Sequence, residues 1–99
     1  AVGSALMGSY FGILETAQGW LSAPGLGEVA GRTDLAGLFA NLGKVAVASP
    51  DSFAALREAH STRGGLNEQI FRDFARGGGT AALTAALGGV LARVQGRAQ

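Results

Sequence analysis

The sequence lacks cysteine altogether and contains one histidine, His60. Without thiols the chain can form no disulfide, no thiolate metal site and no cysteine nucleophile, and its redox compartment stays undetermined. A single imidazole also excludes metal sites that need several histidines. Cysteine-based catalysis is therefore excluded, and we expect no metal in this chain.

Charge is also scarce. Charged residues make up 15% of the chain, and eight basic against seven acidic side chains leave a net charge of +1. Because they are scattered, we expect no nucleic-acid partner, and the lack of a Lys/Arg-rich face argues against a peripheral membrane bundle. The longest uncharged runs, 1–14, 16–27 and 77–92, are shorter than the roughly 18–20 residues of a spanning helix, so we expect no membrane segment.

Glycine and apolar residues are abundant instead, with 17 Gly and 47% hydrophobic residues in 99. Each glycine inside a helix costs about 1 kcal/mol relative to Ala, and eight of them together are comparable to the ~5–15 kcal/mol stability of a domain. We therefore expect close helix packing over a larger surface than one copy offers, as in an interlocked homodimer. The eight are Gly8, Gly12, Gly19, Gly31, Gly37, Gly43, Gly88 and Gly89.

Apolar residues recur with the 3.6-residue period of helices, and no alternating strand pattern interrupts them. The first helix is predicted from Gly3 to Ser22 and is ended by Pro24-Gly25. The second is predicted from Glu28 to Ala48. On the first, Ser4, Gly8 and Gly12 form a ridge of small residues, and the apolar residues Leu6, Tyr10, Ile13, Leu14, Ala17 and Leu21 form another face. Both faces of this helix are expected to be buried.

Three shorter helices complete an all-α domain of about five helices over residues 1–99. Ser49-Pro50-Asp51 is expected to begin the third as N-cap, N1 proline and first-turn acid, with Phe53 and Leu56 inward and an end near His60. The fourth follows Gly64-Gly65, carries Leu66, Ile70 and Phe74 on one face, and ends at Gly77-Gly78-Gly79. Thr80 is predicted to cap the fifth, whose apolar face holds Leu83, Leu87, Val90, Leu91 and Val94.

The most informative stretch is 56–68, Leu-Arg-Glu-Ala-His-Ser-Thr-Arg-Gly-Gly-Leu-Asn-Glu. It predicts a turn with two glycines that leads into a helix N-terminus, where free backbone N–H groups and the helix dipole favour a carboxylate or phosphate. Arg63 would add a bidentate donor. The alternative is that Gly64 and Gly65 only separate two helices and that Asn67 caps the second.

This stretch resembles the C-terminal domain of the pyrroline-5-carboxylate reductase family. The family pattern has a leucine, a Ser-Pro-Gly-Gly-Thr-Thr turn a few residues later, a helix that ends in Gly-Gly, and a last amphipathic helix that closes on an arginine. With Gly64-Gly65 on the paired glycines, Leu56 to Arg93 aligns without a gap. The matched positions include Arg72, Gly77-Gly78, Ala81 and Arg93. Gly3-Ser4 and Tyr10 to Glu15 resemble the family's Gly-Ser-Gly-Pro-Ala-Tyr opening and a glutamate of its first long helix, although the proline is absent.

The resemblance implies a fold like the C-terminal domain of 6-phosphogluconate dehydrogenase, in which the first two long helices interlock with a second copy as a homodimer. It also implies a cytoplasmic oxidoreductase that transfers hydride from NAD(P)H to an imine or oxo group of a small carboxylate. The cofactor would belong to a separate N-terminal Rossmann domain. No G-x-G-x-x-G between a strand and a helix occurs in these residues, so we expect no cofactor site and no activity in this chain alone. The start at Ala1, without Met, leads us to expect a processed product or an excised domain.

The resemblance places the substrate-binding turn at Ser61, Thr62, Arg63, Gly64, Gly65, Leu66 and Asn67. Arg63 occupies the family's proline position, and Leu66 and Asn67 occupy those of its two threonines. Because a site built on hydroxyl hydrogen bonds discriminates strongly, their loss favours an imine or oxo acid other than the proline precursor. The competing interpretation is a non-enzymatic helical self-association module.

Five further residues were candidates for a role. An imidazole such as His60 suits proton transfer near neutral pH, but a histidine that closes a short helix more often stabilises the C-terminal dipole. Glu15 is a polar group on an apolar helix that reaches either solvent or an arginine. Trp20, Phe39 and Phe74 are expected to be core or dimer anchors, because no basic residues interleave with them as in a base-stacking surface.

Overall fold

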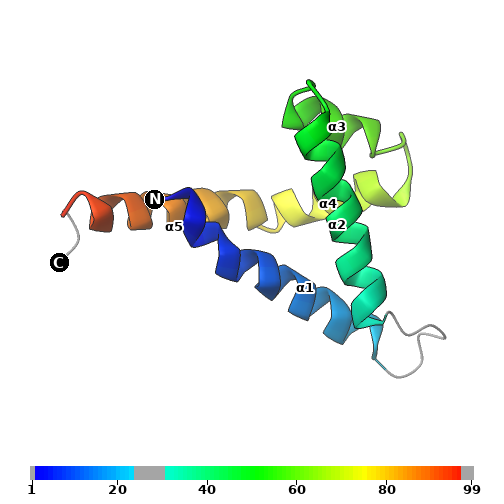
Figure 1. The fold of residues 1–99 in the computed structure, drawn as a ribbon, viewed down its shortest axis with the longest axis horizontal. Helices are drawn as coiled ribbons and strands as arrows, with labels where there is room; N and C mark the ends of the chain where they lie inside the picture. Colours follow the sequence, from blue (N-terminus) through cyan, green and yellow to red (C-terminus); the bar gives the residue numbers. More distant parts are fainter. Residues whose placement is uncertain (1, 24–30, 97–99) are drawn as a thin grey trace. The chain divides into compact units, whose positions relative to one another are not determined.

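The computed structural model describes residues 2–23 and 31–96 (Figure 1). A 3-10 turn, η1 (Gly3–Leu6), precedes five α-helices: α1 (Met7–Leu21), α2 (Arg32–Ala48), α3 (Phe53–Ala59), α4 (Leu66–Arg76) and α5 (Gly79–Val94). No strand occurs in these two ranges, so the predicted all-α fold class with five helices is confirmed. None of the helices in the same ranges is long and apolar enough to cross a membrane.

The chain divides after Pro50 into two units. The first contains η1, α1 and α2, and the two α-helices diverge from each other (Figure 1). They meet where the ring of Tyr10 stands edge-on to the ring of Phe39, with 6.1 Å between the ring centres. Leu14 and Leu35 are half-buried between these helices. A single layer of side chains therefore holds this unit together.

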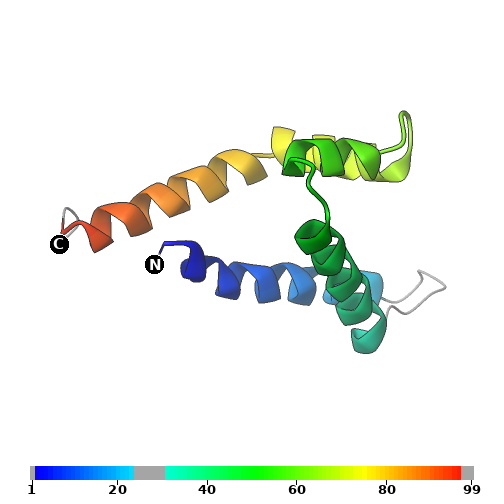
Figure 2. The same cartoon turned by 45° about the horizontal axis from the view of Figure 1, so that its top comes forward.

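The second unit contains α3, α4 and α5. The guanidinium of Arg57 on α3 lies over the Phe71 ring on α4, 4.7 Å from the ring centre. Between α4 and α5, Gly78 has a φ of 101°, which is strained for any residue with a Cβ. A Cβ on Gly79 would overlap the Phe74 ring. The glycines thus let α5 leave the end of α4 without turning back alongside it (Figure 2).

Neither unit has a core: no residue of the described ranges is buried. Trp20 is 66% exposed and Phe74 is 49% exposed, so neither is a core residue of the single chain, and Phe39 is only half-buried. Phe53 is 77% exposed. The prediction that it points inward is wrong, because the first residue of a short helix stays in solvent here, whereas Leu56 is half-buried as expected.

The first two helices begin later than predicted. Residues 3–6 form a 3-10 turn, and α-helical geometry begins at Met7 and ends at Leu21. The second helix was predicted to begin at Glu28, but Gly31 has an extended backbone and α2 begins at Arg32. Residues 28–30 lie outside the described residues. Pro24-Gly25, the predicted end of the first helix, also lies outside them. The ridge is uncovered, because nothing lies within 4 Å of a Cβ built on Gly8 or Gly12.

Two predicted N-caps are wrong. Ser49 is the C-cap of α2 in extended backbone, as expected of a residue before proline. The N-cap of α3 is Ser52, whose Oγ accepts a hydrogen bond from the Ala55 N–H at 3.1 Å, and Asp51 precedes the helix. Thr80 lies within α5, because Gly78 caps that helix in the left-handed conformation.

Replacing Ser52 by Ala is expected to lower the free energy of unfolding by about 1 kcal/mol, since the Ala55 N–H loses its side-chain acceptor. Urea unfolding followed by circular dichroism measures the change. Ser22→Ala is the matched control, because Ser22 closes α1 through its backbone N–H, and it is expected to change stability by less than about 0.5 kcal/mol. Equal effects of the two substitutions would contradict the assigned cap.

Candidate functional site

The turn between α3 and α4 has the two-glycine geometry that the sequence predicts. The Gly65 N–H donates to the Thr62 carbonyl at 2.8 Å and closes the turn. Gly64 has a φ of 75°, which favours glycine. A Cβ on Gly65 would lie 2.9 Å from the Thr62 carbonyl oxygen, so the chain passes too close for a side chain. Both glycines are therefore required by the backbone.

The N-terminus of α4 is partly occupied by a carboxylate of the chain itself. Gly65 is the N-cap, and Glu68, in the first turn of the helix, reaches back to accept the Gly64 N–H through Oε1 at 3.0 Å. A carboxylate here is stabilised by the positive end of the helix dipole. Asn67 lies inside the helix, so the alternative that Asn67 caps α4 is wrong. The turn thus has fewer free donors than expected, because its two glycine N–H groups already have acceptors.

Beside the turn, α3 and α4 enclose a groove of about 340 Å³. Its lining combines two guanidiniums, two carboxylates, one hydroxyl and one aromatic ring. These belong to Arg57, Arg72, Glu58, Glu68, Ser61 and Phe71. The guanidinium Nη2 of Arg57 is 3.9 Å from Glu58 Oε1, and Nε of Arg72 is 3.7 Å from Asp73 Oδ1. Both distances exceed those of hydrogen bonds, so the guanidiniums keep donors for a ligand.

The predicted site residues do not all lie on the turn, because α4 begins at Leu66 and includes Leu66 and Asn67. Ser61 lines the groove, whereas Arg63 is exposed and takes no part in its lining. Thr62 contributes its backbone carbonyl, and Leu66, the first residue of α4, is 78% exposed. Their role in binding a substrate stays a prediction.

The sequence analysis missed the roles of Arg57, Glu68 and Phe71. Arg57 and Phe71 lie on different helices, so no helical spacing connects them. Glu68 could have been found in part: a glutamate three residues after an N-cap commonly returns to the N–H of the cap residue, and Glu68 reaches the N–H one residue earlier, that of Gly64.

His60 is the C-cap of α3. Its Nδ1 lies 2.7 Å from the Leu56 carbonyl oxygen, and since a carbonyl only accepts, Nδ1–H is the donor. This contact satisfies one of the last carbonyls of the helix. It agrees with the helix-end interpretation of His60, which is not among the residues that line the groove.

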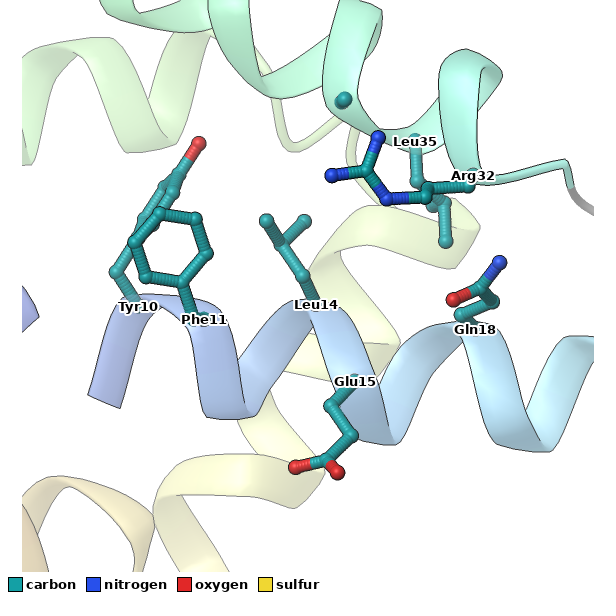
Figure 3. A pocket seen from close by; sticks show the side chains of 8 residues that line it. Tyr10, Phe11, Leu14, Glu15, Gln18, Arg32 and Leu35 are labelled. Atoms are coloured by element: carbon teal, nitrogen blue, oxygen red, sulfur yellow. The ribbon is translucent and has the colours of Figure 1, made fainter. Parts of the chain in front are cut away.

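A second groove, of about 270 Å³, lies between α1 and α2 in the first unit. Figure 3 shows the Arg32 guanidinium above Leu14, while Glu15 points away from it. Glu15 is exposed, so of its two predicted environments the structure shows solvent. The walls are mainly apolar, with Tyr10, Phe11, Leu14 and Leu35 among the lining residues. This groove therefore offers packing surface more than chemistry.

Across residues 2–23 and 31–96, no group of three or more His, Asp or Glu side chains could hold a metal ion. Comparison with known proteins gives no assignment either: no family, no curated protein and no solved structure matches this chain.

Proposed function

We propose that this chain is the homodimerisation and substrate-side domain of an oxidoreductase similar to pyrroline-5-carboxylate reductase. The observation that carries the proposal is the missing core: apolar helices are present, yet no described residue is buried. A domain of this kind obtains its core by interlocking with a second copy, in a fold like the C-terminal domain of 6-phosphogluconate dehydrogenase. Hydride transfer from NAD(P)H to a small imine or oxo carboxylate, a Rossmann domain elsewhere in the protein and a cytoplasmic location follow from the sequence resemblance.

Large apolar side chains are exposed in each unit, among them Leu38 on α2 and Ile70 on α4. A second copy would cover such faces, as in obligate homodimers, whose interfaces are large and hydrophobic. The apolar character of α5, in which Leu83 and Leu91 are both exposed, supports the same conclusion.

The geometry of the turn supports the substrate-side assignment. Gly64 and Gly65 both meet backbone requirements there, as paired glycines of a binding turn would. A groove with two guanidiniums lies directly beside it. The competing function, a self-association module without a substrate, is favoured by the same missing core but gives no reason for this groove.

The first experiment is a mass measurement. We expect light scattering of the purified chain at micromolar concentration to give twice the 9.9 kDa monomer mass. A monomer mass with folded, cooperative unfolding would show that the two units cover each other within one chain, and it would overturn the dimer. A control at the same concentration in urea is expected to give the monomer mass.

The coding sequence upstream of Ala1 separates the two functions. A βαβ unit with a glycine-rich turn there would support the reductase, whereas a start codon immediately before Ala1 would support the module. The 99 residues alone are expected to give no nicotinamide-dependent turnover, and measurable turnover would contradict the proposal.

A further inference from the structure

We propose that the Phe74 ring is a wedge that holds the joint between α4 and α5 open, so that α5 packs against a second copy instead of folding back on its own α4. The joint is the run Gly77, Gly78 and Gly79, at which α4 ends and α5 begins. The inference rests on the proposed function, since it names the element that favours pairing between copies over closure within one chain.

The backbone of the joint would permit a hairpin. Two residues, Gly77 and Gly78, separate the end of α4 from the start of α5, and connections of about two to five residues commonly join antiparallel helices. Gly78 is left-handed, with a φ of 101°, a conformation that glycine adopts without strain. Yet α5 does not return along α4 (Figure 2). The length and conformation of the connection therefore do not by themselves keep the two helices apart.

Both helices have apolar faces that a hairpin would cover. On α4, Leu66, Ile70 and Phe74 follow one another at intervals of four, which places them on one face, and Ile70 is 70% exposed. On α5, Leu83 is 42% exposed and Leu91 is 43% exposed. Because burial of apolar surface is favourable, closure of the joint would be favourable unless something at the joint opposes it.

The Phe74 ring lies where it opposes closure. It packs so closely against the backbone of Gly79 that a Cβ built there would overlap three of its ring atoms. Gly79 lies one helical turn before Leu83, so it is the first position on the apolar face of α5. Folding α5 back would bring this face onto the face of α4 that carries Phe74, and the ring already fills the space between them.

The neighbouring side chains restrict the movement of the Phe74 ring. The Phe71 ring lies beside it, with 6.5 Å between the ring centres. The guanidinium of Arg57 on α3 in turn lies 4.7 Å from the centre of the Phe71 ring. Since Phe71 is held by this cation–π contact, the Phe74 ring cannot move toward it freely. Arg57 and Phe71 are therefore positioning residues that keep the wedge in place.

The inference is tested by measuring the distance between α4 and α5 with double electron–electron resonance. The substitutions Gln69→Cys and Ala85→Cys supply the labelling sites, since the chain has no cysteine of its own. Dilution with unlabelled chain removes distances between copies. In an open joint the two labelled backbone positions lie up to about 25 Å apart, because a helix rises about 1.5 Å per residue. In a closed hairpin they lie about 10 Å apart, the distance between packed helices.

We expect the parent chain to give the long distance. Phe74→Ala is expected to shift most of the population to the short distance and to raise the monomer fraction in light scattering at equal concentration. Gly79→Ala, whose Cβ displaces the ring while every apolar side chain is kept, is expected to act in the same direction. Phe53→Ala is the matched control, because it removes the same ring from an exposed position at the start of α3, and we expect it to change neither measurement.

Three outcomes would overturn the inference: the parent gives the short distance, Phe74→Ala keeps the long distance, or Phe53→Ala closes the joint as much as Phe74→Ala does. Circular dichroism verifies that each variant keeps its helices, and Gly79→Ala decides if Phe74→Ala does not fold. The proposed function fails on a different result, a monomer mass of the parent or an upstream sequence without a Rossmann unit. A parent dimer whose joint ignores Phe74→Ala would therefore reject only the inference.

Discussion

A Leu38→Glu variant is expected to be monomeric and to lose most of its helical circular dichroism at concentrations where the parent chain is folded. Leu38 is 53% exposed on α2 of the single chain. At such a surface position a substitution changes stability by less than about 0.5 kcal/mol. If a second copy covers α2, the variant loses about 2–5 kcal/mol of leucine packing and also places a charge in an apolar contact. A symmetric dimer carries this loss twice.

Ala40→Glu is the matched control for Leu38→Glu. It adds the same charge two residues further along α2, and Ala40 is separated by one helical turn from Lys44, with which a glutamate would pair. We expect its mass and stability to equal those of the parent within about 0.5 kcal/mol. A folded Leu38→Glu variant with parent stability would place α2 outside the interface and contradict the proposed dimer.

The thermal midpoint is expected to rise by about 5–10 °C when the concentration of the parent chain is raised a hundredfold. For a dimer that unfolds to two chains, this change in concentration adds about 2.7 kcal/mol of stability. A folded unit of roughly 200 residues shifts by about 2–4 °C per kcal/mol. Scanning calorimetry at two concentrations measures the effect directly.

A midpoint that does not depend on concentration would mean that the core forms within one chain. The two units would then cover each other, and the homodimer would be wrong even if the turn binds a substrate. Heating and cooling at each concentration must superimpose for the comparison to hold, because irreversible unfolding makes the midpoint depend on scan rate.

Helical periodicity predicted the five helices, but not all of their ends. Ser49 and Ser52 are equally good N-cap residues by type, and spacing alone could not choose between them. The backbone conformation decides between them. Pro50 keeps Ser49 extended, and the hydroxyl of Ser52 accepts the Ala55 N–H. Gly78 replaces Thr80 as a cap for a similar reason, since the chain must turn with positive φ before α5.

The position of the candidate site was predictable, while its chemistry was only partly so. Paired glycines before a polar helix start predicted the turn, and the left-handed Gly64 confirms that turn. The groove was not predictable, because the contact between Arg57 and Phe71 joins two helices whose relative placement no local pattern encodes. The prediction of buried residues failed for a different reason. An apolar helix face such as that of α5 indicates that another surface packs against it, but it does not indicate whether the same chain or a second copy supplies that surface.

The absence of any fully buried residue among those described has a kinetic consequence. If the core exists only between two copies, folding and association are one event, and the refolding rate must rise with chain concentration. Newly synthesised chains would remain partly helical, aggregation-prone monomers until they meet, and dilution would lengthen the lifetime of that monomeric state. Aggregation and productive pairing would then compete for the same apolar helices, so the yield of folded protein would depend on how quickly a matching chain is found.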